Sequence, residues 1–267
     1  MKTLLNKNAP IGVIDSGVGG LTVLKRLKEL LPREHFIYLG DTARTPYGSR
    51  DESTVRSFVQ QMLDYLEKQQ VKLVVVACNT LSVLGIDTLQ KGRLFPIVGM
   101  SKGAKLVLAA SHNKNIGIFA TEFTIKSHAH ANAILTLNPE VNLVPQACPK
   151  IVPLIEGEAF GSAELTKVIT DYAACMQDAG VDTIILACTH YPFIKKEIEQ
   201  AVGPEVAVID PAEQTALDTK TILMENNLLH DGVGRSKIVF TKDLERGKRL
   251  AARMFTVTDC EFKEVVL

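Results

Sequence analysis

The chain has 267 residues, of which 46% are hydrophobic, and this length allows one large hydrophobic core or two smaller ones. Its 30 lysine and arginine residues equal its 30 aspartate and glutamate residues, so no net charge favours binding to nucleic acid or anionic lipid. Five cysteines are scattered without a CxxC pair, which argues against a disulfide framework and against a structural zinc site. We therefore expect free thiols, no bound metal and a small-molecule partner.

The sequence also argues against a membrane protein. Residues 1–10 are too short and too polar for a signal peptide. The longest apolar runs are far below the roughly 20 residues that a membrane helix needs. We therefore expect a cytoplasmic protein.

Short runs of β-branched residues alternate with amphipathic stretches, a pattern typical of a mostly parallel sheet flanked by helices. Two helical faces are predicted in the first part of the chain, over residues 21–31 and 55–66. The strands predicted in this part are Ile11–Asp15, Phe36–Leu39, Leu73–Ala77 and Pro96–Gly99.

A second series of elements nearly repeats this order. Its predicted strands are Ile116–Ala120, Val141–Val144 and Thr183–Ala187, separated by helices over Lys126–Leu135 and Ala163–Ala179. The later elements are the strands Val206–Asp210 and Lys237–Phe240, with a helix over Ala212–Met224, and the chain end is expected to return to the first unit. The sequence thus predicts two pseudo-symmetric α/β domains, residues 1–98 plus 207–267 and residues 99–206.

One decapeptide occurs nearly twice. Val71–Thr80 reads VKLVVVACNT and Val181–His190 reads VDTIILACTH, so Cys78 and Cys188 each end a buried strand where a helix begins. The amino end of a helix favours the thiolate form of a cysteine. Two such thiols facing each other across a cleft between the domains could remove a proton from one face of a carbon and deliver one to the other. We expect the other three cysteines, 148, 175 and 260, to be buried structural residues.

The glycine cluster at residues 15–22 follows a strand and precedes a helix, where a dinucleotide-binding fingerprint would lie. Asp41, about 20 residues further on, even resembles the ribose-binding acid of that motif. However, Thr22 replaces the third glycine, and Asp15 places a carboxylate where a pyrophosphate needs positive potential. Asp15 is instead a candidate proton-transfer partner of Cys78, as His190 is of Cys188.

Two further segments follow predicted strands. Residues 41–48 read equally well as an ordinary turn and as a loop that binds a carboxylate. Residues 120–124 offer hydroxyl groups suited to a small polar substrate, although helix capping would explain one of the two threonines.

Taken together, these blocks resemble the signature segments of bacterial glutamate racemases, in the same order and spacing over nearly the whole chain. The segments are Ile14–Thr22, Gly40–Arg44 with Pro46–Gly48, Ala77–Thr80, Ala147–Pro149 with Val152–Leu154, and Ala187–Pro192. The resemblance implies a cytoplasmic, homodimeric and cofactor-independent isomerase. It would interconvert L- and D-glutamate by two-base proton transfer and supply this D-amino acid for peptidoglycan synthesis, and so for cell wall biogenesis and cell shape.

The same resemblance implies the roles of individual residues. The two catalytic thiols would be Cys78 and Cys188, with Cys78 deprotonating the D enantiomer and Cys188 the L enantiomer. The supporting acids and the histidine would be Asp15, Glu156 and His190. The substrate would contact Asp15, Ser16, Tyr47, Gly48, Asn79, Thr80, Thr121, Thr124, Thr189 and His190.

The chain departs from the family pattern at Leu81 and at the segment Ser101–Ala104. Leu81 is expected on the helix behind the site, where it would affect domain packing or product release. Three alternatives stay open: a racemase for aspartate or another acidic or cyclic amino acid, a nucleotide-binding oxidoreductase, and a non-catalytic binding protein. A pyridoxal-phosphate signature is not evident, but sequence alone leaves a lysine aldimine site open as well.

Overall fold

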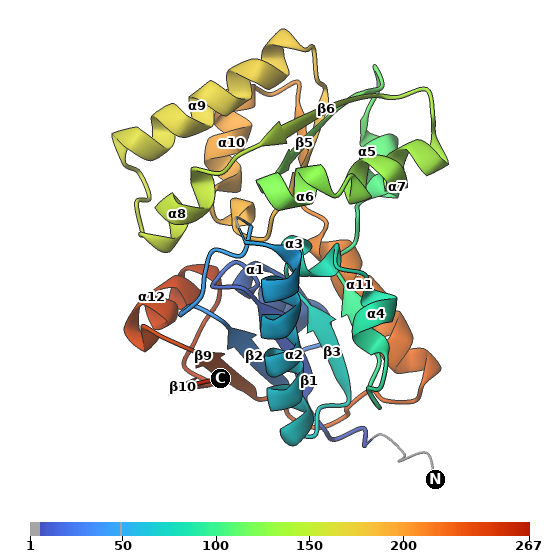
Figure 1. Cartoon of the computed structure of the whole chain (residues 1–267), viewed down its shortest axis with the longest axis vertical. Helices are drawn as coiled ribbons and strands as arrows, with labels where there is room; N and C mark the ends of the chain where they lie inside the picture. Colours follow the sequence, from blue (N-terminus) through green and yellow to red (C-terminus); the bar gives the residue numbers. More distant parts are fainter. Residues whose placement is uncertain (1–5, 49) are drawn as a thin grey trace. The chain divides into compact units, whose positions relative to one another are not determined.

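The computed structural model describes residues 6–48 and 50–267 and divides into two α/β units (Figure 1). The first unit comprises Met1–Met100 and Ala212–Leu267, and the second comprises Ser101–Pro211. The chain thus leaves its first unit once, forms the second and returns.

The first unit contains a six-stranded sheet in the order β10-β9-β2-β1-β3-β4, with every neighbouring pair parallel. Its central strands are fully buried because they consist of apolar, mostly β-branched residues covered by helices on the sheet faces. The strands are β1 (Ile11–Asp15), β2 (Phe36–Gly40), β3 (Leu73–Val76), β4 (Ile97–Gly99), β9 (Ser236–Phe240) and β10 (Cys260–Glu264).

In the described part of this unit, six helices accompany the sheet. Helix α2 begins where the Asp51 carboxylate accepts the backbone N–H of Thr54 at 2.9 Å, and its Leu66 side chain contacts β1 beside Gly12. Helix α1 packs against α11 and α12. The helices are α1 (Leu21–Leu30), α2 (Glu52–Lys68), α3 (Asn79–Ser82), α4 (Ile86–Gln90), α11 (Ala212–Glu225) and α12 (Leu244–Met254).

The second unit contains a four-stranded parallel sheet in the order β6-β5-β7-β8. Helix α5 packs against α7, and their apolar side chains Val107 and Ile134 form a core with Ile118 and Ile185 of the sheet. Helix α9 packs against α10 (Figure 1). The strands are β5 (Asn115–Ala120), β6 (Asn142–Ala147), β7 (Thr183–Ala187) and β8 (Ala207–Ile209). The helices are α5 (Ala104–Ala110), α6 (Glu122–Lys126), α7 (Ala129–Leu137), α8 (Ile151–Glu156), α9 (Ala163–Asp178), a 3₁₀ helix (Tyr191–Ile194) and α10 (Lys195–Val202).

The two sheets share one strand order. In the first unit β2, β1, β3 and β4 lie side by side, and in the second unit β6, β5, β7 and β8 follow the same sequence of steps. Cys78 therefore follows β3 and Cys188 follows β7, which are equivalent strands of the two units. The predicted α/β class, with mostly parallel sheets flanked by helices, is confirmed.

Three predictions about elements need correction. Strand β8 pairs with β7 of the second unit, so the predicted domain division after residue 206 falls too early. The helix predicted over 126–135 is interrupted, because His128 has a left-handed φ of 55° between α6 and α7. Cys175 is exposed on α9 and Cys260 is only partly buried on β10, whereas Cys148 is buried as expected.

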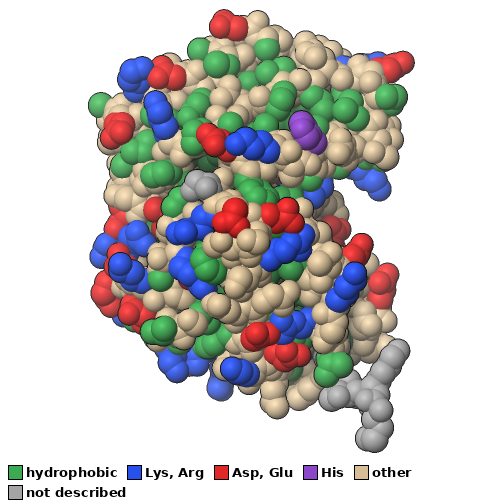
Figure 2. Space-filling model, viewed as in Figure 1, with side chains coloured by type: hydrophobic (Ala, Val, Ile, Leu, Met, Phe, Trp, Pro, Cys, Tyr) green, Lys and Arg blue, Asp and Glu red, His purple; other side chains and the backbone are tan. Residues whose placement is uncertain are grey.

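The surface agrees with the balanced composition. On the face drawn in Figure 2, lysine and arginine side chains are interspersed with aspartate and glutamate side chains. No helix within residues 6–48 and 50–267 combines the length and the apolar character that a membrane span requires.

A buried ion pair joins distant segments of the first unit. The Lys72 ammonium, which is fully buried at the start of β3, lies 2.5 Å from the Glu34 carboxylate. It also donates to the backbone carbonyls of Lys7 at 2.6 Å and Leu228 at 2.8 Å. The Lys72 side chain, directly before β3, thus connects the segment before β2, the start of the described chain and the segment after α11.

Replacing Lys72 by methionine is therefore expected to lower the free energy of unfolding by about 3–5 kcal/mol, because it leaves the Glu34 carboxylate buried without its cation. Urea unfolding would measure the change. Arg26→Met breaks a solvent-exposed pair with Glu29 and should change stability by less than about 1 kcal/mol. Equal effects of the two substitutions would contradict a special role for the buried pair.

Candidate functional site

In the first unit, the candidate residues Asp15 and Cys78 and the start of the segment at residues 41–48 lie at one edge of the sheet. Asp15 ends β1, Asp41 follows β2 and Cys78 follows β3, and β1 lies between β2 and β3. Because carboxyl ends of neighbouring parallel strands meet at the same edge, these side chains share one region. The backbone N–H of Asp41 donates to the Asp15 carbonyl at 3.0 Å, which joins two of these segments directly.

The glycine-rich turn between β1 and α1 brings polar groups close to the Cys78 thiol. The Ser16 hydroxyl lies 3.6 Å from the Cys78 sulfur, and a buried Asp15 oxygen accepts the Gly17 backbone N–H at 2.8 Å. A side chain at Gly20 would place its Cβ 2.7 Å from the Asp15 Cβ and 3.1 Å from the Ala77 carbonyl oxygen. Glycine is thus needed here for close packing beside the cysteine, as the interpretation as a tight turn predicted.

Asn79 is the clearest sign of a ligand in this unit. Its side chain is 2% exposed, and neither its amide oxygen nor its amide nitrogen has a hydrogen-bond partner among the described residues. Buried amides almost always form hydrogen bonds, because leaving one unsatisfied is costly. The neighbouring Thr80 is also buried, and Leu81, the next residue of α3, is fully buried. The amide of Asn79 therefore indicates a polar ligand next to Cys78.

The loop from Asp41 to Gly48 is held by its own carboxylate. The Tyr47 hydroxyl donates to Asp41, and the Arg44 guanidinium donates to the same carboxylate at 2.5 Å. Burial and the neighbouring Asp41 raise the pKa of Tyr47 well above its usual value, so the phenol stays protonated. Because the Tyr47 hydroxyl is used inside the loop, any carboxylate held here would meet the backbone near Gly48.

In the second unit, three buried side chains form a chain of contacts. The Nδ1 atom of His190 lies 3.9 Å from the Cys188 sulfur, and its Nε2 atom lies 2.8 Å from a Glu156 oxygen. Burial acts to lower the pKa of His190, but its contacts with Cys188 and Glu156 outweigh this effect and raise it well above 6.5. Glu156 thus orients the imidazole, which can hold positive charge beside the thiol, the arrangement that activates nucleophilic and basic cysteines.

The predicted threonines of the second unit also lie at strand ends. Thr121 follows β5 and begins α6, and its hydroxyl accepts the Thr124 backbone N–H at 3.3 Å. The two hydroxyl oxygens are 3.0 Å apart. Thr189, which lies between Cys188 and His190 in the sequence, is buried. Helix capping thus explains part of the role of Thr121, as the sequence suggested.

One neighbour of Cys188 was not singled out from the sequence. Tyr191 is fully buried, and its hydroxyl donates to the Cys148 carbonyl at 3.2 Å. Burial, together with the nearby Cys188 and Cys148 sulfurs, raises its pKa well above 10. Its place within the Ala187–Pro192 segment was the signal that could have drawn attention to it.

The segment Ser101–Ala104, one of the two departures from the family pattern, leads into α5, of which Ala104 is the first residue. Gly103 has a left-handed φ of 61°, and a Cβ there would lie 2.5 Å from the Ile185 side chain. The left-handed backbone and the close Ile185 side chain together favour glycine at this position.

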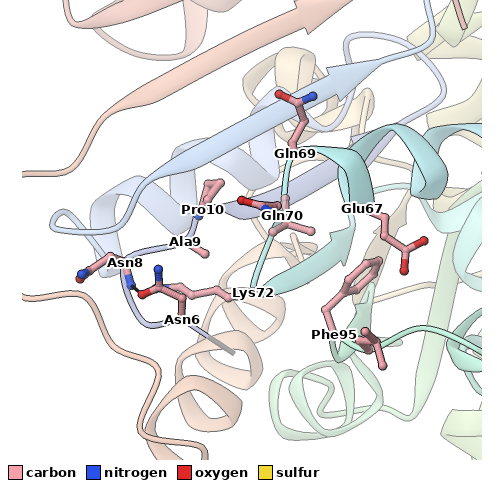
Figure 3. A pocket seen from close by; sticks show the side chains of 11 residues that line it. Asn6, Asn8, Ala9, Pro10, Glu67, Gln69, Gln70, Lys72 and Phe95 are labelled. Carbon is pink, nitrogen blue, oxygen red and sulfur yellow. Dashed lines mark hydrogen bonds between the residues drawn. The ribbon is translucent and has the colours of Figure 1, made fainter. Parts of the chain in front are cut away.

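A cavity of about 510 Å³ lies elsewhere in the first unit, near Pro10 and Lys72 (Figure 3). It contains none of the predicted site residues, and the Lys72 ammonium beside it already binds Glu34 and two carbonyls. Its polar lining consists of the amides of Asn6, Asn8, Gln69 and Gln70 with Glu67. The carboxyl ends of the strands, which carry the cysteines and their polar neighbours, are therefore the better candidate for the functional site. Within the described residues, no group of three histidine, cysteine, aspartate or glutamate side chains is arranged to hold a metal ion.

Residues 11–218 match the family model described as Asp/Glu/Hydantoin racemase. A glutamate racemase of Lysinibacillus sphaericus is 44% identical over 223 residues, 83% of this chain and 84% of the relative. The crystal structure of glutamate racemase isoform RacE1 from Bacillus anthracis superposes with a TM-score of 0.91 at 32% identity, covering 98% of this chain and 99% of the other. Glutamate racemase from Francisella tularensis, solved in complex with D-glutamate, gives 0.87 at 32% identity with 98% of both chains covered. By sequence and by fold, the chain belongs to the Asp/Glu/Hydantoin racemase family.

Proposed function

We propose that this protein is a cofactor-independent glutamate racemase in which Cys78 and Cys188 act on one α-carbon from opposite faces. The observation that carries the proposal is the placement of the two thiols. Each follows the equivalent strand of its unit, and each has polar side chains at its sulfur. The glutamate racemases matched over most of this chain support the choice of substrate.

In this mechanism, one cysteine starts as thiolate and the other as thiol. The thiolate removes the α-proton, and the electron pair of the broken C–H bond remains on the substrate as a carbanion stabilised by its carboxylate. The opposite thiol then delivers its proton to the other face, so the product has inverted configuration and the two cysteines have exchanged protonation states. We assign the D enantiomer to Cys78 and the L enantiomer to Cys188.

The carbanion is the difficult intermediate, because charge develops next to a substrate carboxylate that is already negative. Fixed hydrogen-bond donors therefore have to stabilise it without a cofactor that withdraws electrons. The buried amide of Asn79, which has no hydrogen-bond partner among the described residues, supports such a role. We propose that Thr80, Thr189, Ser16 and the Tyr47–Gly48 turn bind the substrate with it, and that Thr121 and Thr124 contribute from the second unit.

Asp15 and the pair His190–Glu156 would manage the protons of their respective thiols. For Cys188, the imidazole at 3.9 Å supplies positive charge when the sulfur is a thiolate. For Cys78, the buried Asp15 carboxylate at the neighbouring strand end would instead accept and return a proton, because a carboxylate supplies no positive charge to a thiolate. The two halves therefore use different partners, so a change in one partner should not affect both thiols alike.

We further propose that the enzyme works as a homodimer in the cytoplasm and supplies D-glutamate for peptidoglycan synthesis. All five cysteines are free thiols, which is the usual state in a reducing compartment.

Purified protein is expected to interconvert L- and D-glutamate without added cofactor, to keep its activity after chelation, and to act on aspartate more slowly. Optical rotation measured from each enantiomer towards the racemate would follow the reaction, with absorbance spectra recording any bound pyridoxal phosphate. Faster turnover of aspartate, or activity that depends on an added cofactor or metal, would overturn the proposal.

A further inference from the structure

Thr241 connects the end of the chain to the loop from Asp41 to Gly48. It directly follows β9, is 9% exposed, and donates its hydroxyl hydrogen to an Asp41 carboxylate oxygen at 2.8 Å. The same hydroxyl oxygen accepts the backbone N–H of Ala43 at 2.9 Å. One hydroxyl group thus binds both the side chain and the backbone of a segment 200 residues away.

A second contact lies next to the first. The Thr42 hydroxyl accepts the backbone N–H of Lys242 at 3.0 Å and donates to the Lys242 carbonyl at 2.5 Å. The backbone N–H of Thr241 also donates to the Gly40 carbonyl at 3.1 Å, which continues the pairing of β2 with β9. The start of the loop is therefore fixed to Thr241 and Lys242, directly after β9, by both side-chain and backbone hydrogen bonds.

Asp41 passes this constraint on to the rest of the loop. The carboxylate oxygen that Thr241 leaves untouched accepts from the Tyr47 hydroxyl and from Arg44. Asp41 is fully buried, so its position depends on the donors around it. A valine in place of Thr241 would remove one donor from Asp41 and would leave the Ala43 N–H without its acceptor.

We propose that Thr241 is a positioning residue for the substrate loop, acting through Asp41 to fix the Tyr47–Gly48 turn. The inference rests on the proposed function to the extent that this turn binds the substrate carboxylate. Thr241 does not take part in the chemistry itself, and it lies outside every segment that the sequence singled out.

Thr241→Val is expected to raise the KM for both glutamate enantiomers by roughly tenfold, as loss of a hydrogen bond in a buried network would. The flanks of the pH profile should stay in place, because the thiols and their partners are untouched. Thr241→Ser keeps the hydroxyl and should restore the KM. Thr219→Val is the matched control, since Thr219 is fully buried on α11 and its hydroxyl donates to the Thr215 carbonyl at 2.8 Å.

Thr219→Val should lower the melting temperature without changing the KM. If Thr241→Val does the same, with a KM within about twofold of wild type, the residue is merely structural and the proposal fails. Should Thr241→Val not fold, Tyr47→Phe cuts the same chain of contacts at its other end and should raise the KM alone. An unchanged KM in Tyr47→Phe would equally overturn the proposal.

Hydrogen–deuterium exchange of the substrate-free protein separates this proposal from the assignment of function. In Thr241→Val the amide of Ala43 and its neighbours in residues 41–48 should exchange faster than in wild type, and in Thr219→Val they should not. If wild type does not act on glutamate, the proposed function fails, while the exchange rates still decide whether Thr241 fixes the loop. Unchanged exchange in Thr241→Val would show that it does not.

Discussion

Replacing either Cys78 or Cys188 by serine is expected to lower racemisation by roughly 1,000-fold or more in both directions. A serine hydroxyl is a far weaker acid than a thiol, so it is not ionised as a base near neutral pH. A single remaining thiol can only return a proton to the face from which it came. Polarimetry starting from each enantiomer would measure the loss.

The double variant should be little worse than either single one, because residues that act as a unit have strongly non-additive effects. Cys175→Ser is the matched control, since this thiol is exposed and its replacement buries no hydroxyl. Cys148→Ser should retain turnover while losing some stability, because it places a hydroxyl at a buried position. Near wild-type racemisation by Cys78→Ser or Cys188→Ser would refute the two-thiol mechanism.

The sequence predicted most strands because they are short, apolar and buried on both faces. β1 and β7 were predicted with their observed bounds, and β2 and β9 differ from the prediction by one residue. β10 was missed because Cys260–Glu264 carries charged, exposed residues at the sheet edge and lacks an apolar run. Helix α8 was missed as well, since Pro153 lies within it and interrupts the usual helical signal.

The boundary between the two units could not be predicted from the order of the elements alone. Strand β8 is only three residues long and lies just before the chain returns to the first unit, so its sequence fits either sheet. Its pairing with β7 decides the matter, and pairing between strands is not encoded in local spacing. The repeated order of elements was enough to predict two units. It was not enough to predict the residue at which the chain returns to the first unit.

The parts of the candidate site that could be predicted are those whose residues lie close together in the sequence. Cys188 and His190 are two positions apart, and the structure brings them together as expected. The resemblance named Glu156 as a supporting acid, but its contact with His190, which spans 34 residues, was not predicted. The contacts of Thr241 with Asp41 and Ala43 span about 200 residues, and no pattern in the sequence pointed to them.

His190→Asn is expected to lower kcat by roughly 100-fold or more, mainly in the direction in which Cys188 begins as the base. The raised pKa of His190 keeps its imidazolium charged beside Cys188 above pH 6.5, and asparagine removes that charge. Because the equilibrium constant between enantiomers is unity, kcat/KM must fall equally in both directions. The alkaline flank of its bell-shaped pH profile should shift in the variant, as a coupled site requires.

The same substitution should have a pH-dependent effect on stability. A histidine whose pKa is raised in the folded state stabilises the fold fully below its unfolded value of about 6.5, and this contribution disappears as the pH rises through the folded value. The loss of melting temperature in His190→Asn should therefore be largest below about pH 6.5 and smaller in alkaline buffer. Glu156→Gln removes the carboxylate that lies 2.8 Å from His190 and should show the same trend. The reason is that deprotonation of His190 at higher pH removes the ion pair in the wild-type protein. A loss of stability that is constant across this range would mean that His190 is neutral in the folded protein, and the charge-based role assigned to it at Cys188 would have to be abandoned.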